Sequence, residues 1–295
     1  MSTAPQSTPH VSLTDLRELK DRRQPIVMVT AYDYPSGRLC ADAGIDVLLV
    51  GDSGAMTVLG HDSTVPVTLD EMVILAAAVR RGAPDALVVG DLSFGSYESS
   101  DELAVESAVA LRKRGAVDLV KLEGGSNMAV RVSAIVNAGI AVCGHIGLTP
   151  QSSVMLGGYR AQGRTAQQAI QLVDDARAIE AAGASLIVLE GISSPIATRI
   201  TEELTIPTIG IGAGPACDGQ VLVYHDLLGL TEGRRPRFVR EYAELGSATT
   251  DALRSFARDV RARNYPGPEH EYTIPQEELL LFNEGVAPHA RQPHH

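Results

Sequence analysis

The stretch TLDEMVILAAAVRRGAPDALVVGD, residues 68–91, carries the pattern that decides the fold. Thr68 and Glu71 have the spacing of a capping box, and the apolar residues that follow predict a helix ending near Gly82. The run 86–90 is continuously apolar, which is typical of a strand covered on both faces. Asp91 follows directly. This stretch therefore predicts a unit made of a helix, a buried strand and a polar residue at the end of the strand. We expect the same unit elsewhere in the chain.

This unit repeats along the chain. Eight short apolar runs predict strands at 26–30, 47–50, 86–90, 118–122, 140–143, 185–189, 206–210 and 220–224. Helical stretches lie between them, with start signals at Thr165 and Ser194 and end signals at Gly82, Gly115, Gly139 and Gly183. Because no linker interrupts residues 26–230, we predict an α/β protein with a single (β/α)8 barrel, a TIM barrel, over residues 11–264. An open α/β sheet is the alternative.

The two ends of the chain depart from this pattern. Residues 1–10 are rich in Ser, Thr and Pro, and we predict that they are disordered. Residues 265–295 are rich in Pro and His, and we predict an extended tail with one apolar anchor at residues 279–282.

Composition excludes several classes of protein. The 295 residues are 44% hydrophobic and 21% charged, so a full core is expected. A net charge of −11 disfavours nucleic acid and anionic membranes as partners. The three cysteines are widely spaced, which indicates neither a disulfide framework nor a zinc site. The apolar runs are too short to span a bilayer and the first residues lack a signal-peptide pattern, so we expect a soluble, cytoplasmic protein that binds small molecules.

Polar residues follow nearly every predicted strand, where the loops of a barrel converge on one mouth. They are Tyr32, Asp33, Asp52, Ser53, Asp91, Lys121, Glu123, His145, Glu190, His225 and Asp226, with a glycine-rich run at 210–214. Chance would place one or two acids there, because Asp and Ser commonly begin loops. The excess predicts a functional site. The glycine run lacks the spacing of a dinucleotide fingerprint, and it forms either a turn that closes on a ligand or a bare turn.

Three carboxylates, Asp52, Asp91 and Glu123, follow neighbouring strands. Like charges in one mouth need a cation or raised pKa values, so we predict that these three residues bind a divalent metal. Oxygen ligands with room for water and substrate favour Mg²⁺ over Ca²⁺, and Zn²⁺ would require His or Cys. The alternative is that each carboxylate caps the following helix, and Asp91 is the residue to which this applies best.

Three further residues at the predicted strand ends suggest chemistry. Lys121 shares a strand face with Glu123 and is either a Schiff-base nucleophile or a clamp for a substrate carboxylate; carboxylates beside it favour the charged clamp. Glu190 lies across the mouth and is the candidate general acid or base. His145 is either a core histidine or a residue of the pocket.

Six segments of the chain closely resemble the ketopantoate hydroxymethyltransferase family. They are TAYDYPSGRL (30–39), LLVGDSGAMTVLGHDSTVPVTLDEM (48–72), RRGAPDALVVGDLSFGSY (80–97), VKLEGG (120–125), CGHIGLTPQSSVMLGGYRAQGR (143–164) and TIPTIGIGAGPACDGQVLVYHDLLG (205–229). The resemblance runs from about Leu13 to His270 and implies a barrel of the phosphoenolpyruvate/pyruvate superfamily. It implies transfer of a hydroxymethyl group from 5,10-methylenetetrahydrofolate to 3-methyl-2-oxobutanoate, giving 2-dehydropantoate in pantothenate biosynthesis. A homo-oligomer, typically a decamer, is also implied.

The resemblance also assigns roles to residues of this chain. Asp52, Asp91 and Glu123 match the family's Mg²⁺ site; Ser53 and Lys121 match its 2-oxoacid contacts, to which Asp52 and Asp91 also belong; Glu190 matches its catalytic base and His145 a histidine of its pocket. Whether Glu190 takes the C3 proton or serves the folate amine stays open.

Two alternative functions remain at this stage. One is a carbon–carbon lyase of the same superfamily that acts on another 2-oxoacid, in which Cys143 would be an acid catalyst. Ala141 and Val142 replace the two lysines of the isocitrate lyase motif, which favours a strand residue at Cys143. The other is a barrel that binds a 2-oxoacid or folate without catalysis.

Overall fold

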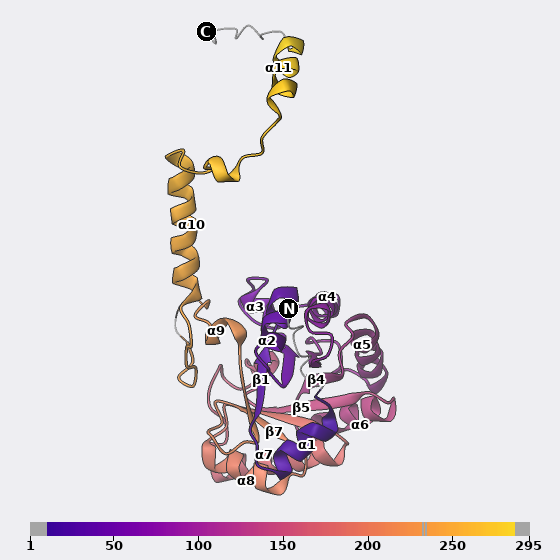
Figure 1. Ribbon diagram of the computed structural model, residues 1–295. Helices are drawn as coiled ribbons and strands as arrows, with labels where there is room; N and C mark the ends of the chain where they lie inside the picture. Colours follow the sequence, from indigo (N-terminus) through magenta and orange to yellow (C-terminus); the bar gives the residue numbers. More distant parts are fainter. Residues whose placement is uncertain (1–10, 232, 234, 287–295) are drawn as a thin grey trace. The chain divides into compact units, whose positions relative to one another are not determined.

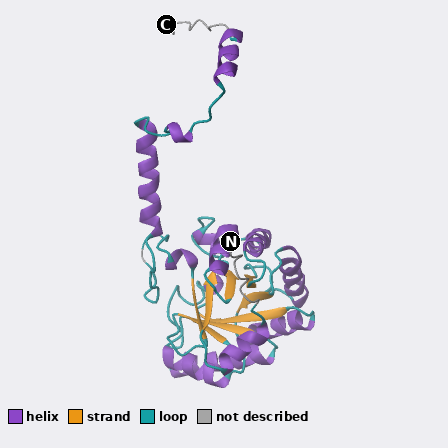
Figure 2. Cartoon of the chain, viewed as in Figure 1, coloured by secondary structure: helices purple, strands orange, loops and turns teal. Residues whose placement is uncertain are grey.

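A computed structural model describes residues 11–231, 233 and 235–286, so the predicted disorder of residues 1–10 and the end of the tail lie outside the described residues. Eight parallel strands close into a barrel in chain order, each hydrogen-bonded to the next and β8 to β1. Figure 1 shows the path of the chain and Figure 2 shows the strands surrounded by helices. The predicted (β/α)8 barrel is confirmed, and the open sheet is wrong because β1 and β8 pair.

The helices and strands alternate as the repeated unit predicts. The strands are β1 (Ile26–Thr30), β2 (Val47–Val50), β3 (Leu87–Asp91), β4 (Leu119–Glu123), β5 (Ala141–Gly147), β6 (Leu186–Glu190), β7 (Thr208–Ile211) and β8 (Gly219–Leu222). The helices before and between them are α1 (Leu13–Asp21), α2 (Tyr34–Asp42), α3 (Gly54–Thr57), α4 (Leu69–Gly82), α5 (Asp101–Arg114), α6 (Ala129–Asn137), α7 (Ala166–Ala181), α8 (Ser194–Glu203) and, after β8, α9 (Tyr224–Leu227).

The predicted helix signals are partly confirmed. Thr68 caps α4 in a reciprocal capping box with Glu71. Thr165 accepts a hydrogen bond from the backbone of Gln168, but that glutamine's side chain accepts from Arg164, so no reciprocal box forms. Ser193, one residue before the predicted start, is the N-cap of α8.

The four predicted helix-end glycines divide into three groups. Gly139 and Gly183 follow their helices in the left-handed conformation, at φ 84° and 98°. Gly115 caps α5 with φ −83°. Gly82 is the last residue of α4 and does not follow the helix as a cap. The need for glycine at this position therefore has another cause, which is given below.

Alternation along each strand divides the buried side chains into two layers. Val47, Leu49, Leu87 and Val89 belong to the cluster inside the barrel, and Leu48, Val50 and Val88 belong to the cluster between the barrel and the helices. Because successive side chains point to opposite faces and both faces are buried, nearly every residue of a strand is apolar.

Helix α1 packs against one end of the barrel. Leu16 is fully buried among the inward-facing strand residues. Lys20 Nζ lies 2.7 Å from Asp218 Oδ2 and donates to the carbonyl of Thr201 at 3.2 Å. The chain before the first strand therefore seals the amino-terminal end of the strands, and the carboxyl end is left for the functional site.

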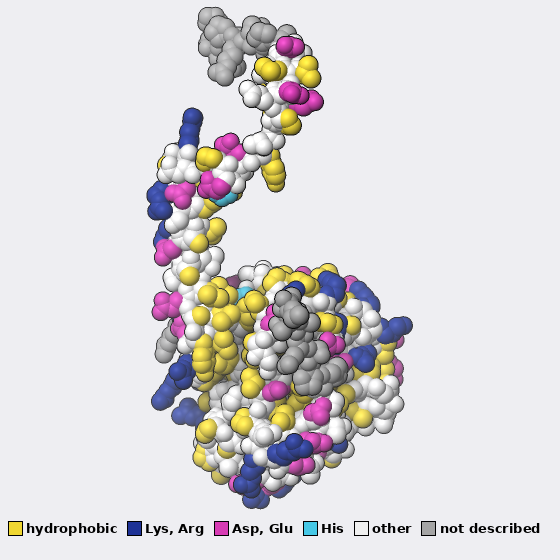
Figure 3. Space-filling view, viewed as in Figure 1, with side chains coloured by type: hydrophobic (Ala, Val, Ile, Leu, Met, Phe, Trp, Pro, Cys, Tyr) yellow, Lys and Arg dark blue, Asp and Glu magenta, His cyan; other side chains and the backbone are white. Residues whose placement is uncertain are grey.

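The chain divides into two compact units, and the second unit begins at Leu245. It contains α10 (Leu245–Arg261), which lies before the predicted tail, and α11 (Gln276–Gly285), which lies within it, so residues 276–285 are helical rather than extended. The predicted anchor, residues 279–282, lies in α11 with exposed fractions of 41% to 61%, and Figure 3 shows hydrophobic side chains exposed on that helix. Among the described residues, no helix is both long and apolar enough to cross a membrane.

Glycine at position 82 is required by the packing of α4 against α2. A Cβ atom there would lie 2.2 Å from the carbonyl oxygen of Tyr34 and 2.9 Å from the backbone nitrogen of Arg38. We predict that Gly82→Ala lowers the free energy of unfolding by at least about 1–3 kcal/mol, because backbone atoms cannot rotate away. Urea denaturation measures this value. Gly285→Ala, in open space, is the control, and equal losses in both variants would contradict the packing argument.

Candidate active site

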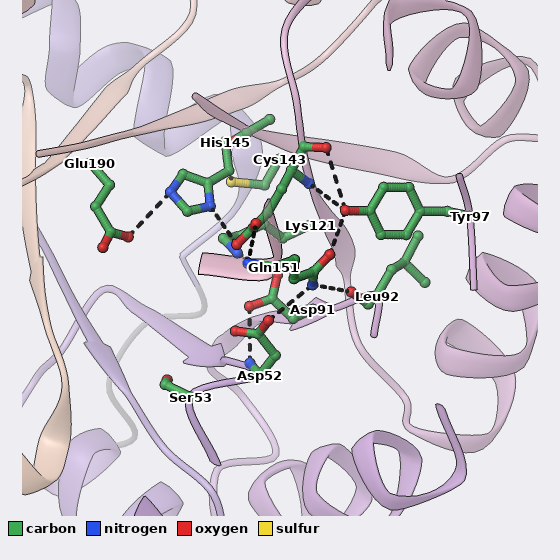
Figure 4. A network of polar contacts seen from close by, with 12 residues as sticks. Asp52, Ser53, Asp91, Leu92, Tyr97, Lys121, Cys143, His145, Gln151 and Glu190 are labelled. Carbon is green, nitrogen blue, oxygen red and sulfur yellow. Dashed lines mark hydrogen bonds and ion pairs between the residues drawn. The ribbon is translucent and has the colours of Figure 1, made fainter. Parts of the chain in front are cut away.

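On strands β3 to β6, the inward-facing side chains change from apolar to ionisable at the carboxyl end of the barrel. Val89 is followed on the same face by Asp91, Leu119 by Lys121 and Glu123, Cys143 by His145, and Val188 by Glu190. Asp52 lies two residues beyond β2. The period of two therefore brings these side chains to one mouth, and Figure 4 shows them in a connected network.

Lys121 and Asp91 form a buried ion pair between Nζ and Oδ1. Burial disfavours the ammonium ion, but the carboxylates of Asp91, Glu123 and Asp52 outweigh it, so the pKa of Lys121 is raised. A lysine that stays protonated cannot attack a carbonyl as a free amine. Of the two roles predicted for Lys121, the geometry favours the charged clamp over the Schiff-base nucleophile.

Asp52 and Asp91 are adjacent, and each is almost completely buried. The backbone N–H of Asp52 donates to Asp91 Oδ2 at 3.1 Å. Burial, with Asp91 and Glu123 close by, raises the pKa of Asp52 to about 8. Burial also raises the pKa of Asp91, against the opposing effect of Lys121. The neighbouring groups therefore do not fully stabilise the carboxylates of Asp52 and Asp91 in their charged forms.

His145 lies between two carboxylates, as Figure 4 shows for Glu190. Its Nδ1 is 3.3 Å from Glu123 Oε1 and its Nε2 is 3.2 Å from Glu190 Oε2. Neither contact has strict hydrogen-bond geometry, and each is an ion pair when His145 is protonated. Burial and Lys121 lower the pKa of His145, whereas Glu123 and Glu190 raise it, and the carboxylates prevail at about 9. His145 is thus part of the polar site rather than an apolar core residue.

Glu190 is the most accessible acid of this group. Its side chain is 17% exposed, against 2% for Glu123 and Asp91. It is the last residue of β6, on the far side of His145 from the Asp91–Lys121 pair in Figure 4. An accessible carboxylate at the edge of the cluster can reach a bound molecule, as the predicted acid–base role requires.

Gln151 and Tyr97 belong to this site although the sequence did not single them out. Gln151 Nε2 donates to Asp52 Oδ2 at 2.9 Å, and the backbone N–H of Gln151 donates to Glu123 Oε2 at 3.0 Å. Tyr97 O–H donates to Gln151 Oε1 at 2.6 Å. Tyr97 lies in the loop after β3, and Gln151 lies in a short 3-10 helix, Pro150–Ser152, in the connection after β5. Each is several positions beyond its strand, so neither is among the residues that directly follow the apolar runs. Their segments, 80–97 and 143–164, nevertheless carry part of the family resemblance.

Ser53 lies at the margin of the network. Its Oγ is 2.8 Å from the hydroxyl of Tyr32, and the Tyr32 ring packs against His225 with centroids 5.4 Å apart. Burial raises the pKa of Tyr32 to about 12 and lowers the pKa of His225. Ser53 is therefore positioned beside Asp52 as a neutral hydrogen-bonding group.

The remaining strand-end residues have local structural roles. Asp33 caps α2, and Asp226 accepts a hydrogen bond from Thr231 at 2.6 Å. Gly212 is in the left-handed conformation, at φ 63°, and a Cβ atom there would lie 2.6 Å from the ring of Phe238. The absence of a side chain at Gly212 thus allows the Phe238 ring to pack against the backbone of the glycine run.

The residues fit a hard divalent cation in chemistry, but they do not form a complete cage. No group of three His, Cys, Asp or Glu side chains in the described part of the chain is arranged to hold a metal ion. Asp52 and Asp91 are nevertheless adjacent oxygen donors with raised pKa values. Mg²⁺ is usually held by one or two carboxylates together with water and substrate oxygens. Asp52 and Asp91 therefore fit Mg²⁺, and Glu123 as a third ligand stays a prediction.

Comparison with known proteins identifies close relatives. Residues 10–268 match the family described as ketopantoate hydroxymethyltransferase. The chain is 54% identical over 262 residues to the 3-methyl-2-oxobutanoate hydroxymethyltransferase of Moorella thermoacetica, covering 89% of this chain and 97% of that protein. It is 55% identical over 257 residues to that of Saccharopolyspora erythraea, covering 87% of each.

Solved structures are similar in fold at low sequence identity. A 2,3-dimethylmalate lyase of the PEP mutase/isocitrate lyase superfamily aligns with a TM-score of 0.56 at 18% identity, covering 92% of this chain and 94% of the other. Oxaloacetate acetylhydrolase aligns with a TM-score of 0.58 at 14% identity, covering 93% of each chain. These likenesses concern the barrel alone.

The burial of Asp52 beside other carboxylates should make the stability of the folded protein depend on pH. Because the pKa of Asp52 is about 8 in the folded protein and near 3.8 when unfolded, its stabilising contribution is complete below pH 4 and is lost as the pH rises through 8. Asn at position 52 carries no such penalty. We predict that Asp52→Asn raises the melting temperature of chelator-treated protein at pH 9 by at least about 2–4 °C, and by less at pH 5.

Differential scanning calorimetry at the two pH values measures the difference. Asp62→Asn, at an exposed position, is the matched control and should change neither melting temperature. A shift of equal size at pH 5 and pH 9 would show that charge burial at Asp52 is not the cause.

Proposed function

Since the chain belongs to the ketopantoate hydroxymethyltransferase family, we propose that it transfers a hydroxymethyl group from 5,10-methylenetetrahydrofolate to 3-methyl-2-oxobutanoate. The product would be 2-dehydropantoate, an intermediate of pantothenate biosynthesis. One observation carries the assignment of the site: a buried group of carboxylates with a charged lysine at the carboxyl end of the barrel. Such a group suits a small substrate that carries both a carboxylate and a keto oxygen.

Magnesium is the proposed cofactor. Asp52 and Asp91 would hold it, with Glu123 as the third predicted ligand. When bound, the cation would act as a Lewis acid that stabilises negative charge developing on the keto oxygen of the substrate. Burial and neighbouring carboxylates raise the pKa values of Asp52 and Asp91, and these shifts support the proposal, because a bound cation would stabilise both groups in the charged form.

Lys121 and Ser53 are proposed to hold the 2-oxoacid. Lys121 is protonated and buried, so it offers a fixed positive charge to the substrate carboxylate. Ser53 offers a hydroxyl whose orientation is limited by its hydrogen bond with Tyr32. Together they would keep the C3 hydrogen of the substrate at a constant place in the mouth.

Glu190 is the proposed base. It would accept the C3 proton, after which C3 forms the new carbon–carbon bond with the methylene carbon of the folate. The two bonds from that carbon to folate nitrogens break, water supplies the hydroxyl oxygen, and the nitrogens take up the released protons as tetrahydrofolate leaves. His145 holds the carboxylate of Glu190 through the 3.2 Å contact at Nε2. A second role for Glu190, proton transfer at the folate amine, uses the same position and is distinguished below.

The lyase alternative receives less support from the site. Cys143 would be its acid catalyst, but the thiol is fully buried in β5 with its pKa raised to about 12 by burial. A thiol with so high a pKa is a weak acid at neutral pH. The structure thus favours the strand role that the sequence predicted for Cys143.

Deuterium exchange at C3 of 3-methyl-2-oxobutanoate tests the proposed function. We expect exchange with solvent D₂O in the presence of Mg²⁺ alone, and formation of 2-dehydropantoate once 5,10-methylenetetrahydrofolate is added. A lyase would exchange little and cleave another 2-oxoacid, and a barrel that only binds ligands would show neither exchange nor product. NMR spectroscopy of the substrate follows all of these outcomes.

The role of Glu190 gives a separate prediction. We expect Glu190→Gln to lower turnover by about 10²–10⁴-fold, because an amide cannot accept the proton, with little change in substrate KM. If Glu190 takes the C3 proton, deuterium exchange falls with turnover; if it serves the folate amine, exchange persists. Unchanged turnover would remove Glu190 from the mechanism. Glu203→Gln, on the outer helix α8, is the control and should retain activity.

A further inference from the structure

Gln151 contacts the carboxylates of Asp52 and Glu123, and Tyr97 contacts the Gln151 side chain and the backbone of Glu123. Both side chains are buried, with exposed fractions of 6% and 2%. Figure 4 shows Tyr97 on the opposite side of the network from Glu190. Neither residue carries a charge at neutral pH, and neither has a role in the proposed reaction. Their contacts with Asp52 and Glu123 therefore need a different explanation.

The hydrogen bonds fix the Gln151 amide in one orientation. Its Nε2 donates to the carbonyl of Leu92 at 3.0 Å and to Asp52 Oδ2 at 2.9 Å. Since a carbonyl oxygen can only accept, the amide nitrogen must face Leu92, and Oε1 must face the hydroxyl of Tyr97. Turning the amide over would place two acceptors together at both Leu92 and Asp52. The N–H group directed at Asp52 is thus determined by its neighbours.

Tyr97 is held in turn by the backbone around it. Its hydroxyl accepts from the backbone N–H of Glu123 at 3.2 Å while it donates to Gln151. Arg131, from α6, donates to the carbonyl of Tyr97 and to that of Glu98, each at 3.2 Å, which fixes the loop that carries the ring. The tyrosine, the amide and the acid therefore form a rigid chain.

Each acid of the metal group has its own partner. Asp91 is paired with Lys121, Glu123 contacts His145, and Asp52 accepts the neutral amide of Gln151. The backbone N–H of Gln151 also donates to Glu123 Oε2, so one residue joins Asp52, which follows β2, to Glu123, the last residue of β4. A neutral donor fixes a carboxylate without the positive charge that would compete with a metal ion.

We propose that Gln151, oriented by Tyr97, is a positioning residue that holds the Asp52 and Glu123 carboxylates in place for divalent metal binding. The proposal rests on the proposed function only through the metal. Neither side chain needs to touch the substrate, so the effect of its loss falls first on metal affinity. Partners that orient a metal ligand typically contribute 10–100-fold to affinity.

Titration of the full-length, substrate-free protein with MgCl₂ in a calorimeter tests this proposal. We expect Gln151→Met to weaken Mg²⁺ binding by about 10–100-fold and Tyr97→Phe, which removes only the hydroxyl, by about 3–10-fold. The Mg²⁺ dissociation constant of the double variant should lie within about twofold of that of Gln151→Met, because Tyr97 acts only through its hydrogen bond to Gln151.

Ser96→Ala is the matched control. Ser96 is buried on the same loop and its hydroxyl donates to the carbonyl of Ser93 at 2.6 Å, with no contact to the acids. It should lower the melting temperature without changing the Mg²⁺ dissociation constant. A purely structural role for Gln151 and Tyr97 would give the same result in all variants.

The outcomes separate this inference from the proposed function. Wild-type affinity in Tyr97→Phe and Gln151→Met overturns the positioning role and leaves the metal intact. Should Gln151→Met fail to fold, Tyr97→Phe alone decides, because Phe keeps the ring that fills the site. Absence of Mg²⁺ binding by the unaltered protein would overturn the metal proposal and this inference with it, and the C3 exchange assay would then show whether the reaction survives.

Discussion

The burial of three carboxylates at the mouth of a closed barrel is the constraint on which the rest of this molecule depends. Asp52, Asp91 and Glu123 are each at least 96% buried, and burial, with repulsion from neighbouring carboxylates, raises the pKa of the first two. Isolated charges of this kind are costly to bury, and they persist only where neighbours pair with them. Lys121, His145 and Gln151 provide those neighbours through three different interactions.

The two ends of the barrel differ in function: the amino-terminal end is packed for stability, and the carboxyl end holds the candidate active site. At the amino-terminal end, Leu16 and the Lys20–Asp218 pair seal the interior with satisfied contacts. At the carboxyl end, Glu123 Oε1 and both ring nitrogens of His145 have no well-formed hydrogen bond within the described part of the chain. The apolar layers between these ends supply the stability that permits an under-satisfied site. This separation is typical of (β/α)8 barrels, whose active sites lie at the carboxyl ends of the strands.

Much of the site follows from the period of a strand. Given that Val89 and Leu119 face inward, the positions of Asp91 and Lys121 follow, since every second side chain points the same way. Gln151 and Tyr97 could not be found in this manner. They reach the site from loops with no repeating geometry, and their side chains resemble those of any polar loop residue until the loop conformation is known.

The sequence by itself determined the order of helices and strands, the barrel, the family and the group of residues at the strand ends, because these depend on local periodicity and on motifs that lie within short segments. Tertiary structure alone decided which partner each acid receives and that the glycine run packs against Phe238. It also decided that residues 276–285 are helical rather than extended. Such outcomes depend on distances of a few ångströms between residues far apart in the chain, such as Asp52 and Gln151, and no local pattern records them.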